Sequence, residues 1–380
     1  MSTVGIIANP VSARDIRRVV ANASNLQTSE RVNIVLRLLS TLASLGVPKV
    51  LMMPDKAGMR TLLSRQLGRI TQGSAIFPVV EFLDFEPGTR VEDTFTATRM
   101  MRAAGVQAIV VLGGDGTHRA VARECGPIPI AGLSTGTNNA FPEMREPTVC
   151  ALAVGLYATG KLAAEDALAA NKMIEVCISP GERRDIAIVD AVIARERVIG
   201  SRALWKTESL AAIYLTYADP QAIGFSAIGG LLHPVGRRDP HGLALELAGA
   251  EHYPLPSAEH YPLPSAEHYP LPSAEHSSIG NAQSQPMPAA EHVRHNPRRL
   301  LAPIAPGMLR TVAIARWWPL EAGVAQPVAT PAGVVALDGE REMPFDRGDQ
   351  LQVTLIPEAF YTIDVARCLR LAAERGLLHC

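Results

Sequence analysis

Hydrophobic positions in the first third of the chain follow two alternating patterns. Short aliphatic runs such as "VGIIA" (Val4–Ala8) and "AIVVL" (Ala108–Leu112) are typical of buried strands, because every position in them is apolar. Between such runs, apolar residues recur at intervals of three and four and the stretches close on glycine, which indicates helices at Arg31–Gly46 and Thr94–Gly105. This alternation predicts an α/β domain built on a parallel sheet with right-handed crossovers.

The pattern changes after a helical stretch at Val149–Asn171. From Lys172 onward short strand-like runs follow one another, and "AIGFSAIGGLL" (Ala222–Leu232) is one of them. Consecutive short strands with glycine, proline and charged turns predict an antiparallel β-sandwich. The spacing of Ile363–Gly376 predicts a last helix that packs back on the first domain. We therefore expect an α/β domain at residues 1–147, an all-β domain at 148–358 and a C-terminal helical segment at 359–380.

One segment interrupts the second domain. The octapeptide "AEHYPLPS" occurs three times in tandem from Ala250 to Ser273 and is followed by a partial "AEH". Two prolines per unit remove backbone donors and exclude a central strand. We expect a disordered repeat loop at about 249–297 between two strands. As an alternative, a metal ion could be collected by the histidines of the repeat, His252, His260, His268 and His276.

Composition excludes several classes of protein. The formal net charge of the 380 residues is −1, and no basic block with interleaved aromatics is present, which argues against a nucleic-acid surface. The start "MSTVGIIANP" is not a signal peptide, and the apolar runs are too short to cross a bilayer. Five scattered cysteines without a CxxC pair are typical of reduced thiols. We expect a cytoplasmic protein without stable membrane association.

The strand at Ala108–Leu112 ends in an unusual turn, Gly113-Gly114-Asp115-Gly116-Thr117. Ligands bind beyond the carboxyl ends of strands in an open parallel sheet. Glycines there permit positive φ angles and close approach of backbone N–H groups, and a helix starting near Thr117 would favour a phosphate. Asp115 could take a proton from an attacking hydroxyl or hold Mg²⁺, or it could merely cap the helix.

A second turn rich in small polar residues, within "GLSTGTNNAFP" (Gly132–Pro142), follows one crossover later. The chain has neither the GxxxxGK[ST] phosphate loop nor the GxGxxG dinucleotide fingerprint. Two adjacent turns of this kind at one sheet edge predict a cradle for a polyphosphate. His118, just inside the helix after the first turn, is expected on the surface.

These motifs resemble the superfamily of NAD kinases, diacylglycerol kinases and sphingosine kinases. "GGDGT" after an aliphatic strand looks like its signature, and "IIANPVSA" is similar to its NPxSG element, with Ala13 in place of glycine. "STGTNNAF" resembles the GTGNDFA loop of the lipid kinases, with Asn139 where aspartate is usual, and "ALDGE" resembles their late DGE element. Within the superfamily the chain is most similar to the ATP-NAD kinase-like acetoin catabolism X branch.

The resemblance implies a nucleotide site in the cleft between the two domains. It implies ATP and Mg²⁺ as cofactors, Asp115 and Glu340 as catalytic carboxylates, and Asp338 as a metal ligand. The residues that would contact the nucleotide are Asn9, Ser12, Gly113, Gly114, Gly116, Thr117, Thr135, Gly136, Thr137 and Asn138. An ordinary hairpin turn is the alternative for Asp338-Gly339-Glu340, and a simple turn pair is the alternative for Asn138-Asn139.

The function so implied is that of an ATP-dependent phosphotransferase. It would move the γ-phosphoryl group to an alcohol of NAD or another small molecule, in acetoin catabolism. The alternatives are a nucleotide-binding accessory or regulatory protein without turnover and a lipid kinase, which Asn139 argues against. We expect a nucleotide and a small-molecule acceptor as partners, no nucleic acid, and a homo-oligomer.

Overall fold

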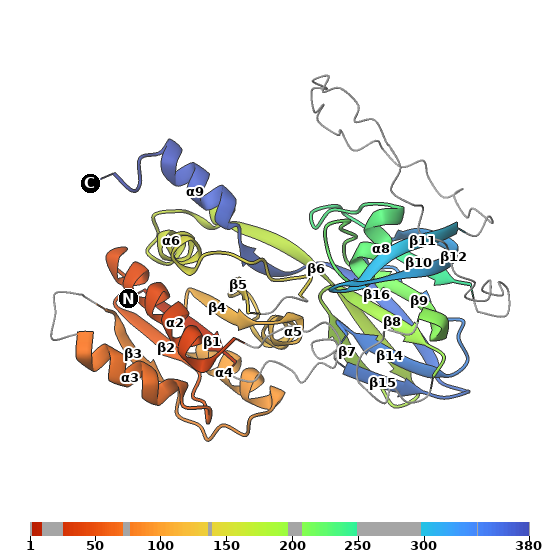
Figure 1. Ribbon diagram of the computed structural model, residues 1–380, viewed down its shortest axis with the longest axis horizontal. Coiled ribbons are helices and arrows are strands. Elements are labelled where there is room, and N and C mark those ends of the chain that lie inside the picture. The colour runs from red at the N-terminus through yellow and green to blue at the C-terminus, as the bar shows by residue number, and fades with distance from the viewer. Residues whose placement is uncertain are drawn as a thin grey trace, which may run out of the picture.

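The fold consists of two lobes that lie side by side (Figure 1). The computed structural model describes residues 2–9, 26–70, 77–135, 139–196, 207–248, 298–339 and 341–379. Ser12, Gly136, Thr137, Asn138 and Glu340, together with the tandem repeat, lie outside the described residues.

The first lobe is built on parallel strands in the order β3-β2-β1-β4-β5. Their bounds are β1 Thr3–Ala8, β2 Lys49–Met52, β3 Val79–Phe82, β4 Ala108–Gly113 and β5 Ile130–Ser134. The helices between and after them are α2 Thr28–Ser44, α3 Met59–Ile70, α4 Val91–Ala103, α5 Asp115–Glu124 and α6 Pro147–Ala158. The predicted parallel α/β domain is confirmed, and β4 lies between β1 and β5.

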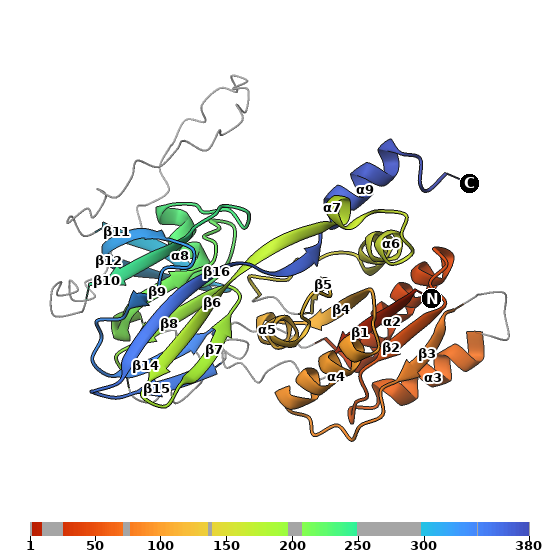
Figure 2. The same cartoon turned by 180° about the vertical axis from the view of Figure 1, so that it is seen from behind.

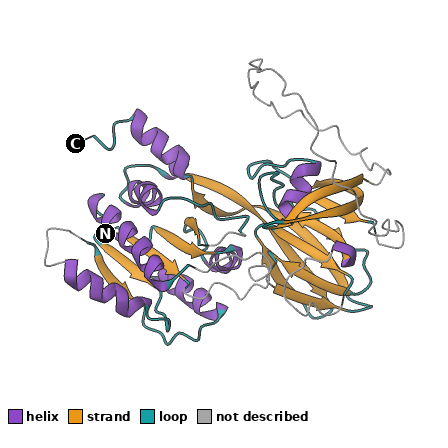
Figure 3. Ribbon diagram, viewed as in Figure 1, coloured by secondary structure: helices purple, strands orange, loops and turns teal. Residues whose placement is uncertain are grey.

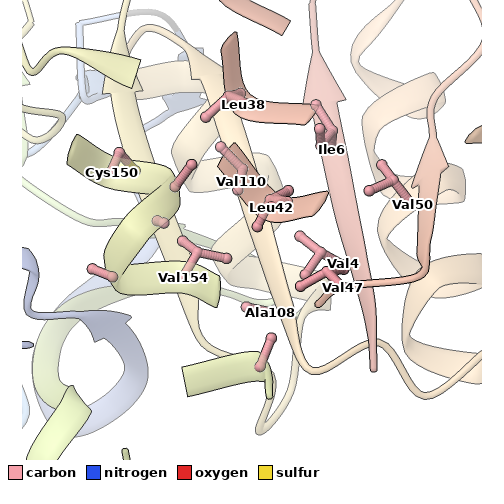
Figure 4. Close-up of a cluster of buried hydrophobic side chains, with 14 of the residues drawn as sticks. Val4, Ile6, Leu38, Leu42, Val47, Val50, Ala108, Val110, Cys150 and Val154 are labelled. Carbon is pink, nitrogen blue, oxygen red and sulfur yellow. The ribbon is translucent and has the colours of Figure 1, made fainter. Parts of the chain in front are cut away.

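Alternate residues of these strands face opposite layers of helices, as the two-residue period of a strand requires. Ile6 and Val110 pack with Leu38 of α2 and Val154 of α6 on one face (Figure 4). Residues of the opposite parity, such as Val111 of β4, pack on the other face against α4 and α5. Both faces of the central strands are buried, which explains their uninterrupted apolar sequences.

The same sheet continues into the second lobe through two long strands (Figure 2). β16 (Gln350–Ile363) joins β5 in parallel at Thr362↔Ile130 and pairs antiparallel with β6 (Leu168–Ser179). β7 (Arg183–Ala187) and β13 (Gln326–Pro327) complete the sheet on the far side. The helical prediction for Val149–Asn171 was therefore wrong at its end, because α6 and the short α7 (Ala164–Ala167) already give way to β6 at Leu168.

A second, antiparallel sheet has the order β11-β12-β10-β9-β8-β14-β15. Its strands are β8 Asp190–Ala194, β9 Leu210–Leu215, β10 Gly242–Leu247, β11 Arg298–Ala305, β12 Met308–Leu320, β14 Gly333–Leu337 and β15 Arg341–Phe345. Ile193 and Val335 of this sheet share a buried cluster with Val176 of β6 and Val353 of β16. The two sheets thus pack face to face, and the predicted β-sandwich is confirmed.

The run Ala222–Leu232 was predicted as a strand but contains helix α8 (Phe225–Leu232) (Figure 3). A nearly continuous apolar run carries no period that separates a strand from a buried helix. The helix packs closely on the sheet, since a Cβ on Gly229 would lie 2.3 Å from Leu215 Cδ1 and one on Gly230 would lie 2.3 Å from the backbone carbon of Asp219. This packing is a tertiary effect that the local sequence does not carry.

The chain ends in helix α9 (Val365–Glu374), which lies against α6 in the first lobe. Cys368 and Ala372 of α9 belong to the same buried cluster as Leu38 and Val154. The Asp364 side chain caps the helix by accepting the N–H of Arg367 at 3.0 Å. The polypeptide therefore returns to the lobe in which it began.

Candidate functional site

The glycine–aspartate turn lies at the carboxyl end of β4, an interior strand of the first lobe. Helix α5 begins at Asp115, two residues earlier than expected, and Gly114 is its N-cap with φ −94° and ψ −172°. Gly113 ends β4, Gly114 is extended and Gly116 lies in the first helical turn, so the expected positive φ angles are wrong. A Cβ on Gly113 would lie 2.6 Å from Thr117 Cβ, and one on Gly114 would lie 2.7 Å from Asn139 Oδ1. The two glycines are needed for close approach of neighbouring side chains.

The Asp115 carboxylate is half-buried and joins this turn to the loop after β5. Its Oδ2 accepts the N–H of Ala140 at 2.9 Å, and its Oδ1 accepts the N–H of Phe141 at 2.8 Å. Asn139 in the same loop donates from Nδ2 to Ser134 Oγ at 2.8 Å. Asp115 therefore connects the two turns that the sequence placed at one sheet edge.

The other described residues of the predicted cradle lie at the same edge. Asn9 follows β1 and donates its N–H to the carbonyl of Leu112 at 3.3 Å. Thr135 is buried beyond β5, and its hydroxyl has no hydrogen-bond partner among the residues that the structure describes. Thr117 packs against Gly113, as given above. An orphaned buried hydroxyl beside the Gly136–Asn138 segment fits a site for a polar ligand.

Asp338 and Gly339 form the hairpin turn between β14 and β15, with φ angles of 49° and 69°. The Asp338 side chain is wholly buried and accepts backbone N–H groups of Ile188, Val189 and Asp190 at distances of 2.8–3.2 Å. Burial raises the pKa of this carboxyl, whereas Arg119 and the three N–H groups oppose that rise. These contacts give Asp338 a structural role and do not favour its assignment as a metal ligand, which stays a prediction.

Helix α5 is held against the second lobe by two arginines. Arg119 is buried, donates from Nη1 to the Leu337 carbonyl at 2.7 Å, and its Nε lies 4.0 Å from Asp338 Oδ2. Arg123 pairs with Asp185 of β7 at 3.2 Å. The two motifs singled out in the sequence, GGDGT and DGE, are thus brought together across α5.

The chain is 52% identical over 378 residues to acetoin catabolism protein X of Cupriavidus necator, a match that covers 99% of this chain and 93% of that protein. The chain belongs to the acetoin catabolism protein X family. Within this family member, residues 4–161 match the ATP-NAD kinase N-terminal domain, and residues 172–261 and 277–358 match the acetoin catabolism protein X C-terminal domain. The resemblance expected from the motifs is confirmed.

Two solved structures are similar to this family member. Yeast NADH kinase complexed with NADH is 13% identical with a TM-score of 0.45, covering 100% of this chain and 88% of that chain. A diacylglycerol kinase from Bacillus anthracis str. Sterne is 10% identical with a TM-score of 0.41, covering 95% of this chain and 96% of that chain.

In the part of the chain that the structure describes, no helix is long and apolar enough to span a bilayer.

The family member also places two residues at the site that sequence reasoning missed. Tyr217, just after β9, is buried and donates its hydroxyl to the Ala140 carbonyl at 2.8 Å. Arg237, in the loop between α8 and β10, donates from Nη2 to the carbonyls of Ala140 at 3.0 Å and Phe141 at 2.8 Å. The paired arginines of "GRRDPH" were the available signal, but nothing local indicates which segment they reach.

The Tyr217 hydroxyl lies among several charges. Burial is the largest cause of its raised pKa, and the positive charge of Arg237 opposes the rise. The negative charges of Asp115, Asp338 and Asp190 raise it further. Three carboxylates therefore contribute to the raised pKa of one buried hydroxyl. The described residues contain no group of three or more potential ligands that could hold a metal ion.

His118 was expected on the surface but is completely buried beneath the turn. Its Nδ1 lies 2.9 Å from the Gly114 carbonyl, and its ring lies 5.8 Å from that of Phe141. Burial lowers the pKa of His118 to about 4, with a smaller contribution from Arg237 and opposition from the Gly114 carbonyl. The expectation was wrong because the loop after β5 covers this side of α5, a contact between segments more than twenty residues apart.

Proposed function

We propose that this chain is an ATP-dependent phosphotransferase that moves the γ-phosphoryl group to an alcohol of NAD or another small molecule. The NAD kinase-type first domain supports the reaction type. The name of the relative from Cupriavidus necator supports a role in acetoin catabolism, and we place that role in the cytoplasm.

The observation that carries the proposal is the position of Asp115. It is the first residue of α5, just beyond the carboxyl end of β4, with a half-buried carboxylate held by two backbone N–H groups. A helix N-terminus favours the negative charge of a phosphate. A carboxylate fixed beside that phosphate can accept the proton of an attacking hydroxyl, and phosphoryl transfer depends mainly on such positioning.

The nucleotide would lie along the edge formed by Asn9, Gly113, Gly114 and Thr135. The buried Thr135 hydroxyl is suited to donate to a phosphate oxygen, because it has no partner within the described ranges. Ser12, Gly116, Thr117, Gly136, Thr137 and Asn138 would complete the cradle. Mg²⁺, when bound, would neutralise phosphate charge. The contacts of Asp338 do not fit direct coordination of the metal.

The test is a transfer assay with labelled ATP against NAD, nucleosides, sugars, small diols and diacylglycerol in vesicles. We expect phosphorylation of a soluble alcohol, reduced by about two to four orders of magnitude in Asp115→Asn, the usual contribution of a positioned base. Asp93→Asn is the matched control, because Asp93 also accepts backbone N–H groups, at the start of α4. Full transfer by Asp115→Asn would exclude the catalytic assignment, and selective use of diacylglycerol would indicate a lipid kinase.

A nucleotide-binding accessory protein without turnover is the second candidate. Both Asp115 oxygens accept backbone N–H groups, so this carboxylate stabilises the loop whether or not a transfer takes place. Saturable ATP binding by the wild-type protein without transfer to any acceptor would favour this candidate over the kinase.

A further inference from the structure

The loop between α8 and β10 is fixed by a buried lysine. Lys172, at the start of the second lobe on β6, donates from Nζ to the carbonyls of Gly236, Asp239 and His241 at 3.1, 2.8 and 2.6 Å. The Asp239 side chain in turn accepts the N–H of Gly236 at 2.7 Å. We call residues 236–241 the bridge loop. Hydrogen bonds from Lys172 and within the loop fix its backbone, so the Cα positions from which its side chains extend are also fixed.

Arg237 extends from the bridge loop to the first lobe. Its guanidinium lies 4.9 Å from the ring centre of Phe141 and 4.4 Å from that of Tyr217, and Nη2 donates to the Ala140 and Phe141 carbonyls. The Tyr217 hydroxyl accepts from the same nitrogen at 3.2 Å. A planar guanidinium that stacks on two rings has far less freedom than an exposed arginine.

The peptide groups that Arg237 contacts belong to the same two residues that hold Asp115. Ala140 and Phe141 donate their N–H groups to the Asp115 carboxylate and offer their carbonyls to Arg237. The Ala140 carbonyl and the Phe141 N–H belong to one peptide group, which therefore has Arg237 at its carbonyl and Asp115 at its N–H. A positive charge at the carbonyl and a negative charge at the N–H polarise that group in the same direction and strengthen both of its hydrogen bonds. The two residues that hold Asp115 are therefore also in contact with a residue of the second lobe.

We propose that Arg237 is a positioning residue for Asp115, acting through the Ala140 and Phe141 peptide groups. The second lobe thereby controls the transfer step, and the bridge loop makes that step depend on how the two lobes are arranged. The catalytic part of this inference rests on the proposed function, whereas the positional part does not.

The neighbouring arginine provides a matched control. Arg238 lies on the same loop but points to the N-terminus of α9, where it pairs with Asp364. Arg237→Met should lower kcat by about ten- to a hundred-fold, the effect of a small misplacement of a catalytic group. The KM for ATP should change by less than about threefold, because the substitution leaves the phosphate cradle in place. Arg238→Met should retain wild-type kcat.

A double-mutant cycle separates positioning from general damage. If Arg237 acts through Asp115, the variant carrying both Asp115→Asn and Arg237→Met should be no slower than Asp115→Asn alone. Multiplying losses in the double variant would overturn the proposal. Tyr217→Phe, which removes one donor to the Ala140 carbonyl and keeps the ring, should give a smaller loss of kcat and serves if Arg237→Met folds poorly.

Amide hydrogen exchange tests the positional part without any catalysis. The amides of Ala140 and Phe141 should exchange faster in Arg237→Met than in the wild type or Arg238→Met. Unchanged protection would overturn the proposal even if transfer is observed. If the wild-type protein transfers no phosphate, the proposed function fails, and faster exchange in Arg237→Met would still establish the link between the lobes.

Discussion

Asp115 and Asp338 both follow a buried aliphatic strand and both accept backbone N–H groups from a distant segment, but their surroundings are opposite. Asp115 is half-buried at a sheet edge, whereas the Asp338 side chain is wholly buried beside Arg119. Hydrogen bonds to a carboxylate therefore do not distinguish a reactive acid from a structural one. Solvent access does, because a substrate hydroxyl can reach only the exposed group. The comparison supports the proposed chemical role for the first turn and a stabilising role for the second.

The largest effect on stability is expected at the second turn. Asp338→Ala removes the acceptor of three backbone N–H groups and the partner of Arg119, so it should lower the free energy of unfolding by about 3–5 kcal/mol. Urea unfolding measures this loss. Asp349→Ala is the control, because Asp349 accepts one backbone N–H and pairs with Arg183 in an exposed turn. A loss of Mg²⁺-dependent ATP binding at unchanged stability would instead make Asp338 a metal ligand.

The next effect concerns His118, which is buried beneath the first turn. The pKa of His118 falls from 6.5 to about 4 on folding, so the unfolded chain binds a proton that the folded chain does not between these values. Stability should therefore fall as the pH drops from 6.5 to 4, by about 3 kcal/mol from this group. Urea unfolding at several pH values should show a flatter dependence in His118→Gln. An equal dependence in both proteins would contradict the buried position of His118.

A smaller loss of stability is expected at the first turn itself. Asp115→Asn places an amide NH₂ where one carboxylate oxygen accepts the N–H of Ala140 or Phe141, so one buried donor loses its acceptor. The free energy of unfolding should fall by about 1–2 kcal/mol, less than for Asp338→Ala. Thermal unfolding of both variants under one condition checks this order. The reverse order would remove the contrast between the two turns.

The smallest effect is expected for the tandem repeat. Leu247 at the end of β10 and Arg298 at the start of β11 both pair with Ile314 of β12, on its opposite sides. The two points are thus about two strand spacings, or roughly 10 Å, apart, which a few residues can span. Replacing Ala250–His276 by a short Gly/Ser linker should change the free energy of unfolding by less than about 0.5 kcal/mol. Lost metal content or failure to fold would show that the repeat histidines matter.

Much of the fold could be predicted because its information is local. The helices of the first lobe can be recognised from apolar residues spaced three and four apart, and its strands from short aliphatic runs. Both signals lie within the segment that forms the element. The long strands β6 and β16 could be predicted only in part. Their ends "LAAN" at Leu168–Asn171 and "FYTI" at Phe360–Ile363 have no clear strand pattern of their own and pair with each other only in the folded chain. Helix α8 was missed for the related reason that a uniform apolar run has no period.

The candidate site likewise has features that could be predicted from local sequence and features that could not. GGDGT and GLSTGTNNAFP were visible because glycine and small polar residues cluster there in sequence. Arg237 and the burial of His118 were not visible, since they arise from contacts between segments that only the folded chain brings together. Arg237 meets Ala140 across 97 positions of the chain. The role of Asp338 also depends on Ile188 and Val189, which carry no side-chain signal because only their backbone N–H groups are used.

The continuous β6–β16 ladder has a mechanical consequence. It runs from one lobe into the other, so a force that twists the lobes apart is carried by paired backbone hydrogen bonds instead of a slack tether (Figures 1 and 2). The register shifts between Ile356 and Phe360, where Glu358 has a φ of 47° and the pairing is interrupted. A β-bulge bends most readily because the ladder is locally broken there. A rotation of one lobe against the other would therefore bend the ladder at Pro357–Ala359 before it separates the paired segments on either side.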